Sequence, residues 1–585
     1  MEYLENLNNE QLKAVTTTFK KVLVVAGAGS GKTRVLTTRI QYLLDKGINP
    51  NNIVAFTFTN RAAKEMMYRL KEYKFYNVYT FHSYCYRILE FGKNELGYQK
   101  FKHLRIVDDE YELSIIEEIK KDLNIDYNPK SLREYITKRK NNIEYDFKSI
   151  DEARIFNQVY YKFQEYLQSR GELDFDDMIS LTVNNLDKLS FKDDIYDECK
   201  YILVDEFQDT NQIQLDLIKK LAYKYNNIFC VGDQNQLIYS FRSSDIKIIN
   251  DFMSEADEVI FLNKNYRSSQ NILSKANKLI IHNHNTIRND LISDIPDKFK
   301  ITYRECPNTS YEAWNCAFII NKLITDGNYN PNEIAVLFRN NYQSNQIEYE
   351  LKKLNIPFTT YGKCKFFDYE ETKRMIALYQ FLENKENYIL FRKAVLIDQI
   401  IYDKIVDTYK HSNNNLLDLI INMNIENVSN YASFIKNIIQ NKSLYDKKQL
   451  FEELINIIFK EASFKSERLR ALKDIIINSE EEDELEIINN LILEDPNDKI
   501  MGVNLMTIHK AKGLEFKCVF LISLNDGILP SNIKNNDLLE EERRVCYVGI
   551  TRAKEFLYLS SSEYHIINGI RKRLQPSLFI SEIRN

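Results

Sequence analysis

The chain lacks the excess of positive charge that many nucleic-acid-binding proteins carry. Its 585 residues include 79 Lys and Arg against 84 Asp and Glu, which gives a formal net charge of −5. Composition alone therefore provides no signal for a nucleic-acid partner. A surface that binds nucleic acid must then be a local groove whose charge differs from that of the whole chain.

Paired cysteines are also lacking. The eight cysteines are scattered singly, without a CxxC spacing. This pattern argues against a disulfide framework and against a cysteine zinc site, and it fits reduced thiols. His282 and His284 lie close together but have no Cys or His partner at ligand spacing, so we interpret them as polar surface residues.

Long apolar runs are missing as well. No segment approaches the roughly 18 consecutive apolar residues that a membrane-spanning helix needs. The first residues, MEYLENLNNEQ, are acidic and polar, unlike a signal peptide. We therefore expect a cytoplasmic protein with no membrane partner.

The strongest positive feature is the stretch Val22–Thr33, VLVVAGAGSGKT. Its apolar start predicts a buried strand, and a Gly-rich turn then leads into a helix near Lys32. Backbone N–H groups of such a turn bind phosphates at a helix N-terminus. We predict a P-loop in which Lys32 reaches the β- and γ-phosphates and Thr33 binds Mg²⁺. Ala26 replaces the first Gly of the usual pattern.

A second strand end carries acidic residues. The apolar run Tyr201–Val204 is followed directly by Asp205 and Glu206. In a P-loop enzyme the first acid of such a pair holds Mg²⁺ and the second polarises the attacking water. Gln234 and Gln236 follow the next predicted strand, Ile228–Asp233, where a glutamine amide can sense a γ-phosphate. An acid-rich turn is the alternative, but it is weak beside a P-loop.

Two features are ambiguous from the residues alone. Tyr239 and Phe241 could stack on a nucleic-acid base or pack in the core, and the segment favours neither. Asp174, Asp176 and Asp177 could hold a metal ion, but no His or basic partner is near in sequence. Capping preferences favour a helix N-cap with acidic first-turn residues there.

The order of strand and helix signals predicts an α/β fold with two cores, each interrupted by an all-helical insertion. A chain of this length predicts about four structural units. We expect the first core at 1–85 and 190–262, its insertion at 86–189, the second core at 263–368 and 500–585, and a shorter insertion at 369–499.

Ten segments together resemble the superfamily 1A DNA helicases of the Rep/PcrA/UvrD type. They are LNNEQ (7–11), AGAGSGKTR (26–34), FTFTNRAAKEM (56–66), TFHS (80–83), LDFDDMI (173–179), VDEFQDTN (204–211), VGDQNQLIYSFR (231–242), NYRSS (265–269), LMTIHKAKGLEF (505–516) and EEERRVCYVGITRAK (540–554). They occur in the family's order and extend over both predicted cores. The resemblance implies RecA-like cores.

For the nucleotide site, the resemblance implies ATP and Mg²⁺ as ligands. It assigns catalytic roles to Lys32, Glu206, Gln236, Arg267 and Arg552, and Mg²⁺ binding to Thr33 and Asp205. The nucleotide-binding positions it implies are Gln11, Ala26, Gly27, Ala28, Gly29, Ser30, Gly31, Lys32, Thr33, Arg34, Arg39, Tyr266 and Glu515. Gln11 would contact adenine, Tyr266 and Arg39 would stack on it, Glu515 would contact the ribose, and Arg552 would be the arginine finger.

For the DNA site, the resemblance implies Phe58, Asn60, His82, Tyr239, Phe241, Arg339 and Asn341, and it favours base stacking for the aromatic pair. Phe241 stands where relatives commonly have Trp. The implied function is ATP-dependent 3′→5′ translocation on single-stranded DNA with strand separation at junctions between single-stranded and duplex DNA. The alternative is a single-strand-stimulated ATPase that works with a nuclease, replication, repair or defence partner. Two features support that alternative. The second insertion is short, and the chain ends about thirty residues after Arg552.

Two other classes fit less well. A non-motor P-loop enzyme such as a kinase has no use for the second core with its GITRA arginine. A binding module without ATPase activity would not need Lys32, Glu206 and Arg552 together.

Overall fold

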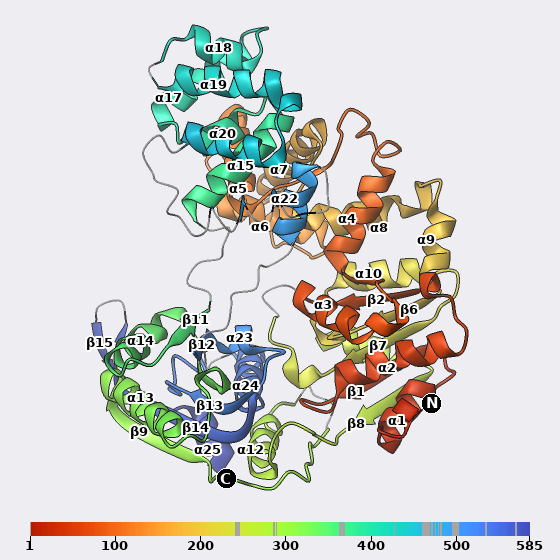
Figure 1. The fold of residues 1–585 in the computed structure, drawn as a ribbon, viewed down its shortest axis with the longest axis vertical. Helices are drawn as coiled ribbons and strands as arrows, with labels where there is room; N and C mark the ends of the chain where they lie inside the picture. Colours follow the sequence, from red (N-terminus) through yellow and green to blue (C-terminus); the bar gives the residue numbers. More distant parts are fainter. Residues whose placement is uncertain are drawn as a thin grey trace. The chain divides into compact units, whose positions relative to one another are not determined.

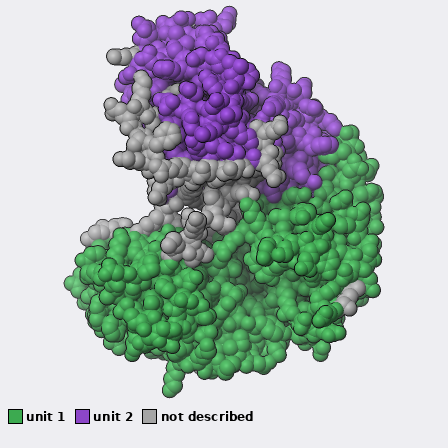
Figure 2. All heavy atoms as spheres, in the orientation of Figure 1, with its two compact units in different colours: residues 1–81, 190–363, 497–585 green, residues 82–189, 364–496 purple. Residues whose placement is uncertain are grey.

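The computed structural model divides into two compact units (Figure 2). Unit 1 comprises residues 1–81, 190–363 and 497–585, and unit 2 comprises residues 82–189 and 364–496. The residues described are all except 1, 240–245, 285, 286, 288, 362–368, 426, 459–468, 470, 471, 474, 475, 478, 480–482, 494–501, 533, 534, 568, 569 and 585. The predicted limits of the two cores and their insertions stay predictions.

The first sheet of unit 1 has six parallel strands in the order β3-β2-β6-β7-β1-β8 (Figure 1). They are β1 (Lys21–Ala26), β2 (Ile53–Thr57), β3 (Val78–Thr80), β6 (Tyr201–Val204), β7 (Ile228–Gly232) and β8 (Glu258–Leu262). β1, β2, β6 and β7 are almost wholly buried, as expected for a parallel sheet covered on both faces. Their carboxyl ends share one edge, where ligands bind in such sheets.

The helices that accompany this sheet are α1 (Asn9–Thr16), α2 (Lys32–Asp45), α3 (Asn60–Arg69), α9 (Lys192–Glu198), α10 (Gln212–Leu221) and α11 (Ile246–Glu255). Three of them, α1, α3 and α10, begin at a side-chain cap, provided by Asn8, Thr59 and Asn211. At α1 the side chain of Asn8 accepts a hydrogen bond from the N–H of Gln11, and the side chain of Gln11 accepts one from the N–H of Asn8. Residues of α1, α2 and α3 pack with β1 and β2 in one apolar cluster.

The second sheet has the order β11-β12-β10-β13-β14-β15, and β9 also pairs with β14. Its strands are β9 (Thr302–Asn308), β10 (Ile334–Phe338), β11 (Phe358–Thr360), β12 (Val503–Thr507), β13 (Phe516–Leu521), β14 (Ala553–Ile567) and β15 (Ile570–Arg573). All pairings are parallel except that of β14 with β15. Two parallel sheets with helical insertions confirm the predicted fold class.

The residues of β10 show which helices cover each face of the second sheet. Ile334, Val336 and Phe338 pack toward α13 (Thr309–Thr325) and α14 (Ser344–Lys353). Ala335 and Leu337 pack in the cluster that contains α12 (Gln270–Ile280), α24 (Asn536–Ile550) and α25 (Leu578–Arg584). Successive strand residues point to opposite faces, so an unbroken apolar run builds two layers of core. The short helix α23 (Ile508–Ala511) follows β12.

Unit 2 contains both insertions, and its described residues form helices and one strand pairing, of β4 (Arg105–Ile106) with β5 (Glu172–Leu173). Its helices are α4 (Phe81–Gly92), which begins at the boundary, α5 (Asp109–Leu123), α6 (Pro129–Lys140), α7 (Ile150–Arg170), α8 (Phe175–Asn185), α15 (Glu370–Glu383), α16 (Tyr388–Val395), α17 (Gln399–Lys410), α18 (Leu416–Asn422), α19 (Val428–Asn441), α20 (Lys447–Ile458) and α22 (Glu484–Leu493). One continuous apolar cluster includes residues of both insertions, from Val107 to Leu167 and from Met375 to Ile488. The two insertions therefore form one helical body.

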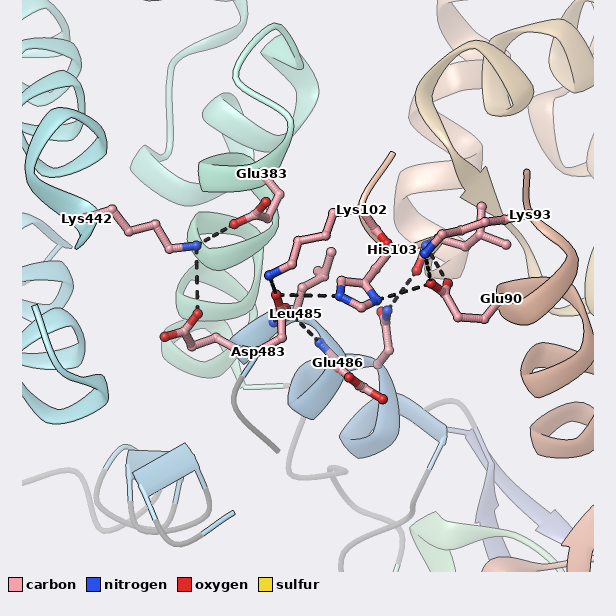
Figure 3. A network of polar contacts seen from close by, with 12 residues as sticks. Glu90, Lys93, Lys102, His103, Glu383, Lys442, Asp483, Leu485 and Glu486 are labelled. Atoms are coloured by element: carbon pink, nitrogen blue, oxygen red, sulfur yellow. Dashed lines mark hydrogen bonds and ion pairs between the residues drawn. The ribbon is translucent and has the colours of Figure 1, made fainter. Parts of the chain in front are cut away.

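Polar contacts also connect the two insertions (Figure 3). His103 of the first insertion lies between Glu90 and Asp483, with Nδ1 3.1 Å from Glu90 Oε1 and Nε2 3.6 Å from Asp483 Oδ2. Lys102 pairs with the same Asp483 carboxylate. Asp483 precedes α22, so this helix of the second insertion is held against the first by charge as well as by apolar packing.

The acidic segment after β5 is a helix cap. Asp174 accepts a hydrogen bond from the N–H of Asp177 at the start of α8, and Asp177 accepts one from the N–H of Asp174. The ammonium of Lys140 pairs with both carboxylates and is almost fully buried. This confirms the capping interpretation. Within the described parts of the chain, no group of three or more His, Cys, Asp or Glu is arranged to hold a metal ion, and no helix is long and apolar enough to cross a membrane.

Candidate functional site: a P-loop cleft between two sheets

The P-loop follows β1 and opens into a cleft of about 320 Å³. We call this the P-loop cleft. It is lined by residues from both halves of unit 1: Gly29, Gly31, Lys32, Thr33, Arg34, Arg69, Glu206, Gln236, Tyr266, Arg267, Gly513, Glu515, Arg552 and Lys554. α2 begins at Lys32 with Gly31 as its N-cap, at a φ of +88° that glycine adopts without strain. The N–H groups of the first helical turn are thus available to an anion.

Asp205 and Glu206 at the end of β6 differ in their electrostatics. Burial, followed by the negative charge of Glu206, raises the pKa of Asp205 to about 7. Burial also opposes ionisation of Glu206, but the charges of Lys32 and Lys512 outweigh it and hold the pKa of Glu206 below its ordinary value. Gln208 Nε2 donates to Glu206 Oε2 at 2.6 Å. Glu206 is therefore an ionised, oriented carboxylate, which suits a base.

Arg552 reaches this cleft from the second sheet and is fully buried. Its Nη2 donates to Gln236 Oε1 at 3.2 Å, while Nε donates to the carbonyl of Val548 at 3.0 Å. Burial and the nearby charge of Arg267 lower the pKa of Arg552 to about 9, so the guanidinium remains charged at neutral pH. Gln236 in turn donates to Asp233 Oδ2 at 2.7 Å. The side-chain contact between Gln236 and Arg552 joins the two sheets.

Arg267 and Glu515 also belong to the cleft. Arg267 Nε lies 2.8 Å from Glu515 Oε2, and Lys554 Nζ lies 2.5 Å from Glu515 Oε1. Glu515 is therefore neutralised by two cations, and the charges of Arg267 and Lys554 keep its pKa below the ordinary value despite burial. Its predicted ribose contact stays a prediction.

The adenine stacking implied for Arg39 stays a prediction, and in this structure the side chain contacts other parts of the protein. Its guanidinium is buried, donates to the carbonyl of Val15 at 2.7 Å and lies over the ring of Phe229. Arg34 and Tyr266 line the cleft instead. Arg34 and Arg39 are five positions apart on α2, which places them about 140° apart around the helix axis. Arg34 and Arg39 therefore leave α2 in different directions.

Gln11 contacts the P-loop itself. Its Nε2 donates to the carbonyl of Ser30 at 2.9 Å, and its side chain is 1% exposed. The adenine contact implied for Gln11 remains a prediction. The contact that is present positions the loop.

The residues predicted to bind DNA come from several elements, and their DNA contacts stay predictions. The rings of Phe58 and Tyr239 stack with centroids 5.3 Å apart and planes 18° apart. Asn60 is the first residue of α3. His82 belongs to unit 2, where its ring packs edge-on against Phe175. Phe241 lies outside the described residues.

Arg339 and Asn341 follow β10 of the second sheet. Arg339 Nη2 donates to the buried carboxylate of Glu542 at 2.8 Å. Asn341 begins a short 3₁₀ helix. Arg339 is thus held in place by an ion pair, and DNA contacts by either residue stay predictions.

Comparison with known proteins agrees with this architecture. The UvrD/REP helicase N-terminal domain matches residues 7–257, and the UvrD-like helicase C-terminal domain matches residues 260–564. The ATP-dependent DNA helicase PcrA of Staphylococcus epidermidis is 35% identical over 634 residues, covering 99% of this chain and 86% of the relative. PcrA of Staphylococcus aureus is 32% identical over 635 residues with the same coverage. The chain belongs to the UvrD/Rep helicase family.

This membership confirms the resemblance drawn from the ten motifs, but one residue of the family motifs was not assigned a role from the sequence. Lys512, three positions before Glu515, donates to Asp209 Oδ2 at 2.5 Å and to the carbonyl of Gln236 at 2.6 Å. Its ammonium also lies 5.0 Å from the ring centroid of Tyr239. The signal that could have found it is its place in LMTIHKAKGLEF, which also contains Glu515.

The donor set at the end of β6 fits Mg²⁺. The hydroxyl of Thr33 lowers the pKa of Asp205 through a side-chain interaction, so the oxygens of the two residues lie near each other. Mg²⁺ prefers oxygen ligands and usually takes only one or two from the protein, the rest coming from phosphate and water. Thr33 and Asp205 are therefore suitable Mg²⁺ ligands in this member of the UvrD/Rep family.

Proposed function

We propose that this protein is an ATP-dependent DNA helicase that moves 3′→5′ on single-stranded DNA and separates duplex strands. The observation that carries the proposal is the P-loop cleft, where Lys32 and Glu206 of the first core face Arg267 and Arg552 of the second. The PcrA relatives are ATP-dependent DNA helicases, which agrees with this function.

In the proposed reaction, the N–H groups of the P-loop and Lys32 bind the phosphates of ATP. Glu206 accepts the proton of the attacking water, because Lys32 and Lys512 keep it ionised. Arg552 and Arg267 stabilise the charge that develops on the transferred phosphoryl group, a contribution of about 10³–10⁵ in rate for an arginine finger. When Mg²⁺ is bound by Thr33 and Asp205, it neutralises phosphate charge.

The two arginines are on the second core, so hydrolysis requires closure of the cores on ATP. Gln236 connects this closure to DNA, because it contacts both Arg552 and Lys512, and Lys512 lies over the ring of Tyr239. Stacking of bases on Phe58 and Tyr239 is independent of sequence and contributes about 1–3 kcal/mol per base. A translocating motor needs that tolerance. The protein acts in the cytoplasm on single strands and on junctions with duplex DNA.

Strand displacement with 3′-tailed and 5′-tailed duplexes tests the function. ATP-dependent unwinding of only the 3′-tailed substrate is expected, and unwinding of only the 5′-tailed substrate would overturn the polarity. If single-strand-stimulated ATPase activity is present without unwinding, the alternative of a translocase that needs a protein partner is favoured, and unwinding should then be restored by co-purifying proteins. No ATPase activity on any DNA would reject both.

A further inference from the structure

Three consecutive carbonyls of the P-loop are held by groups outside the loop. The carbonyl of Ala28 accepts from Asn265 Nδ2 at 2.6 Å, and the carbonyl of Gly29 accepts from the backbone N–H of Tyr266 at 2.9 Å. The carbonyl of Ser30 accepts from Gln11 Nε2 at 2.9 Å. Asn265 and Tyr266 lie in the segment that connects β8 of the first sheet to α12 of the second core.

This arrangement decides where the N–H groups of the loop point. In a trans peptide the C=O of one residue and the N–H of the next point in opposite directions. Holding the carbonyls of Ala28 and Ser30 outward therefore directs the N–H groups of Gly29 and Gly31 toward the other side. The Ser30 N–H is already used by the carbonyl of Gly27, at 3.2 Å. Gly29 and Gly31 thus each direct an N–H group to the side where an anion can bind.

Asn265 has a second set of contacts at the other end of its amide. Its Oδ1 accepts from the N–H of Arg267 at 2.7 Å and from the N–H of Ser268 at 2.8 Å. The side chain is 2% exposed. A single buried amide therefore connects the P-loop to the backbone of Arg267, which lines the same cleft from the other core.

Gly29 is what lets Asn265 approach so closely. A Cβ on Gly29 would lie 2.5 Å from Asn265 Nδ2 and 2.8 Å from the Cβ of Arg267. The backbone of Gly29, at a φ of +67°, is also one that residues with side chains rarely adopt. The glycine of the loop and the asparagine of the connecting segment thus fit each other.

We infer that Asn265 is a positioning residue of the nucleotide site, which turns the N–H groups of the P-loop toward the phosphates and fixes them to the segment that carries Arg267. This inference rests on the proposed ATP binding. Asn265 touches neither phosphate nor metal in this role. It acts through the Ala28–Gly29 peptide.

The test uses the full chain and the variant Asn265→Asp. Aspartate keeps the acceptor for Arg267 and Ser268, but it replaces the donor to Ala28 with an oxygen that repels the carbonyl. The matched control is Asn504→Asp in the second sheet. Asn504 is 1% exposed and also donates to backbone carbonyls, those of Asn332 and Ile334, but it lies in β12.

The measurements are the Kd of a fluorescent ATP analogue, inhibition by inorganic tripolyphosphate, kcat and KM of the ATPase, and the Kd for single-stranded DNA. For Asn265→Asp we expect the analogue Kd, the tripolyphosphate Ki and the KM to rise together, by about tenfold or more, since an unsatisfied buried group faces the loop. We expect kcat at saturating ATP to stay within about threefold, since phosphate binding is shared by ground and transition states. DNA affinity should not change.

The outcomes separate the inference from the proposed function. If the wild type does not bind the analogue, the proposed function fails. If the wild type binds it and Asn265→Asp binds both phosphate probes as tightly as Asn504→Asp does, the inference is wrong. If Asn265→Asp does not fold, Asn265→Ala is measured in its place, because alanine removes the donor without adding a repelling charge. An unchanged Kd in folded Asn265→Ala would also overturn the inference.

Discussion

Lys512 and Asp209 form a buried ion pair in which Nζ lies 2.5 Å from Oδ2, although they come from different cores. Their side chains are 6% and 1% exposed. Burial raises the pKa of Asp209 to about 6, and the charge of Lys512 keeps the rise from being larger. Because Lys512 also contacts the carbonyl of Gln236 and faces the ring of Tyr239, it lies between the nucleotide side and the predicted DNA side of the molecule.

The first prediction concerns Lys512→Met. The change leaves the Asp209 carboxylate buried and unpaired and removes the cation from the face of Tyr239. We expect stimulation of the ATPase by single-stranded DNA to fall by about 5–150-fold, which is the change that typical coupling free energies between two sites produce. The measurement is the ratio of DNA-stimulated to basal ATPase rates. Lys510→Met, at an exposed neighbouring lysine, is the control and should keep full stimulation. Full stimulation in Lys512→Met would show that residues other than Lys512 couple DNA binding to ATP hydrolysis.

The second prediction concerns Tyr239→Ala and Tyr239→Phe. Tyr239 stacks on Phe58 and donates its hydroxyl to the carbonyl of His509 at 3.1 Å. If the ring stacks on a base, Tyr239→Ala should weaken single-strand binding by about 1–3 kcal/mol, while Tyr239→Phe keeps most of the affinity. Fluorescence anisotropy with oligonucleotides of mixed sequence measures this. Tyr223→Ala, at a side chain 81% exposed, is the control. If Tyr239→Ala and the wild type bind single-stranded DNA equally well, the ring of Tyr239 only packs against its neighbours and does not stack on a base.

The third prediction concerns the charge of His509. Burial, with the charges of Arg339 and Lys512, lowers the pKa of His509 to about 4. The ring should stay neutral from pH 7.5 to 5, which histidine-labelled NMR measures, with His509→Gln identifying the resonance. In the unfolded chain a histidine titrates near 6.5, so the unfolded state binds more protons between pH 6.5 and 4. Stability should therefore fall as the pH falls through this window, by at most about 3 kcal/mol from this residue. A midpoint between pH 6 and 7 in the folded protein would contradict the prediction.

The sequence predicted the sheets well because their central strands are continuous apolar runs, such as Val22–Val25 before the P-loop. It also predicted that Glu206 and Gln236 follow strand ends, since parallel strands place such residues at one edge. It did not predict the partners that Arg39 has in the fold, the carbonyl of Val15 and the ring of Phe229. Lys512 was missed because its partners are about 300 positions away, at Asp209.

The joining of the two insertions also could not be predicted from sequence periodicity. Helical spacing indicates which face of a helix is apolar, but it does not tell which other helix covers that face. Here α5 and α16 share one cluster although more than 260 residues separate them. Only the folded chain shows that the second insertion completes the core of the first.

One buried carboxylate contributes to that joint, and the last prediction concerns its removal. Glu172 of the first insertion pairs with Arg105, and their side chains are 0% and 4% exposed. It also accepts from the hydroxyl of Tyr111 at 3.0 Å and from Nδ2 of Asn387 at 3.0 Å. Asn387 is the N-cap of α16, so this carboxylate bonds to the second insertion directly.

Glu172→Ala should therefore loosen both insertions at once. Removing one partner of a buried pair costs about 3–5 kcal/mol, because the other charge stays buried. Hydrogen exchange should accelerate in α5 and in α16 together, while the amides of β1 and β10 in unit 1 keep their protection. The control is Glu110→Ala, whose side chain is 61% exposed and pairs with Lys373, since exposed pairs contribute about 0–1 kcal/mol. If exchange rises in α5 alone, the second insertion is an independent body and the shared core does not bind it to the first.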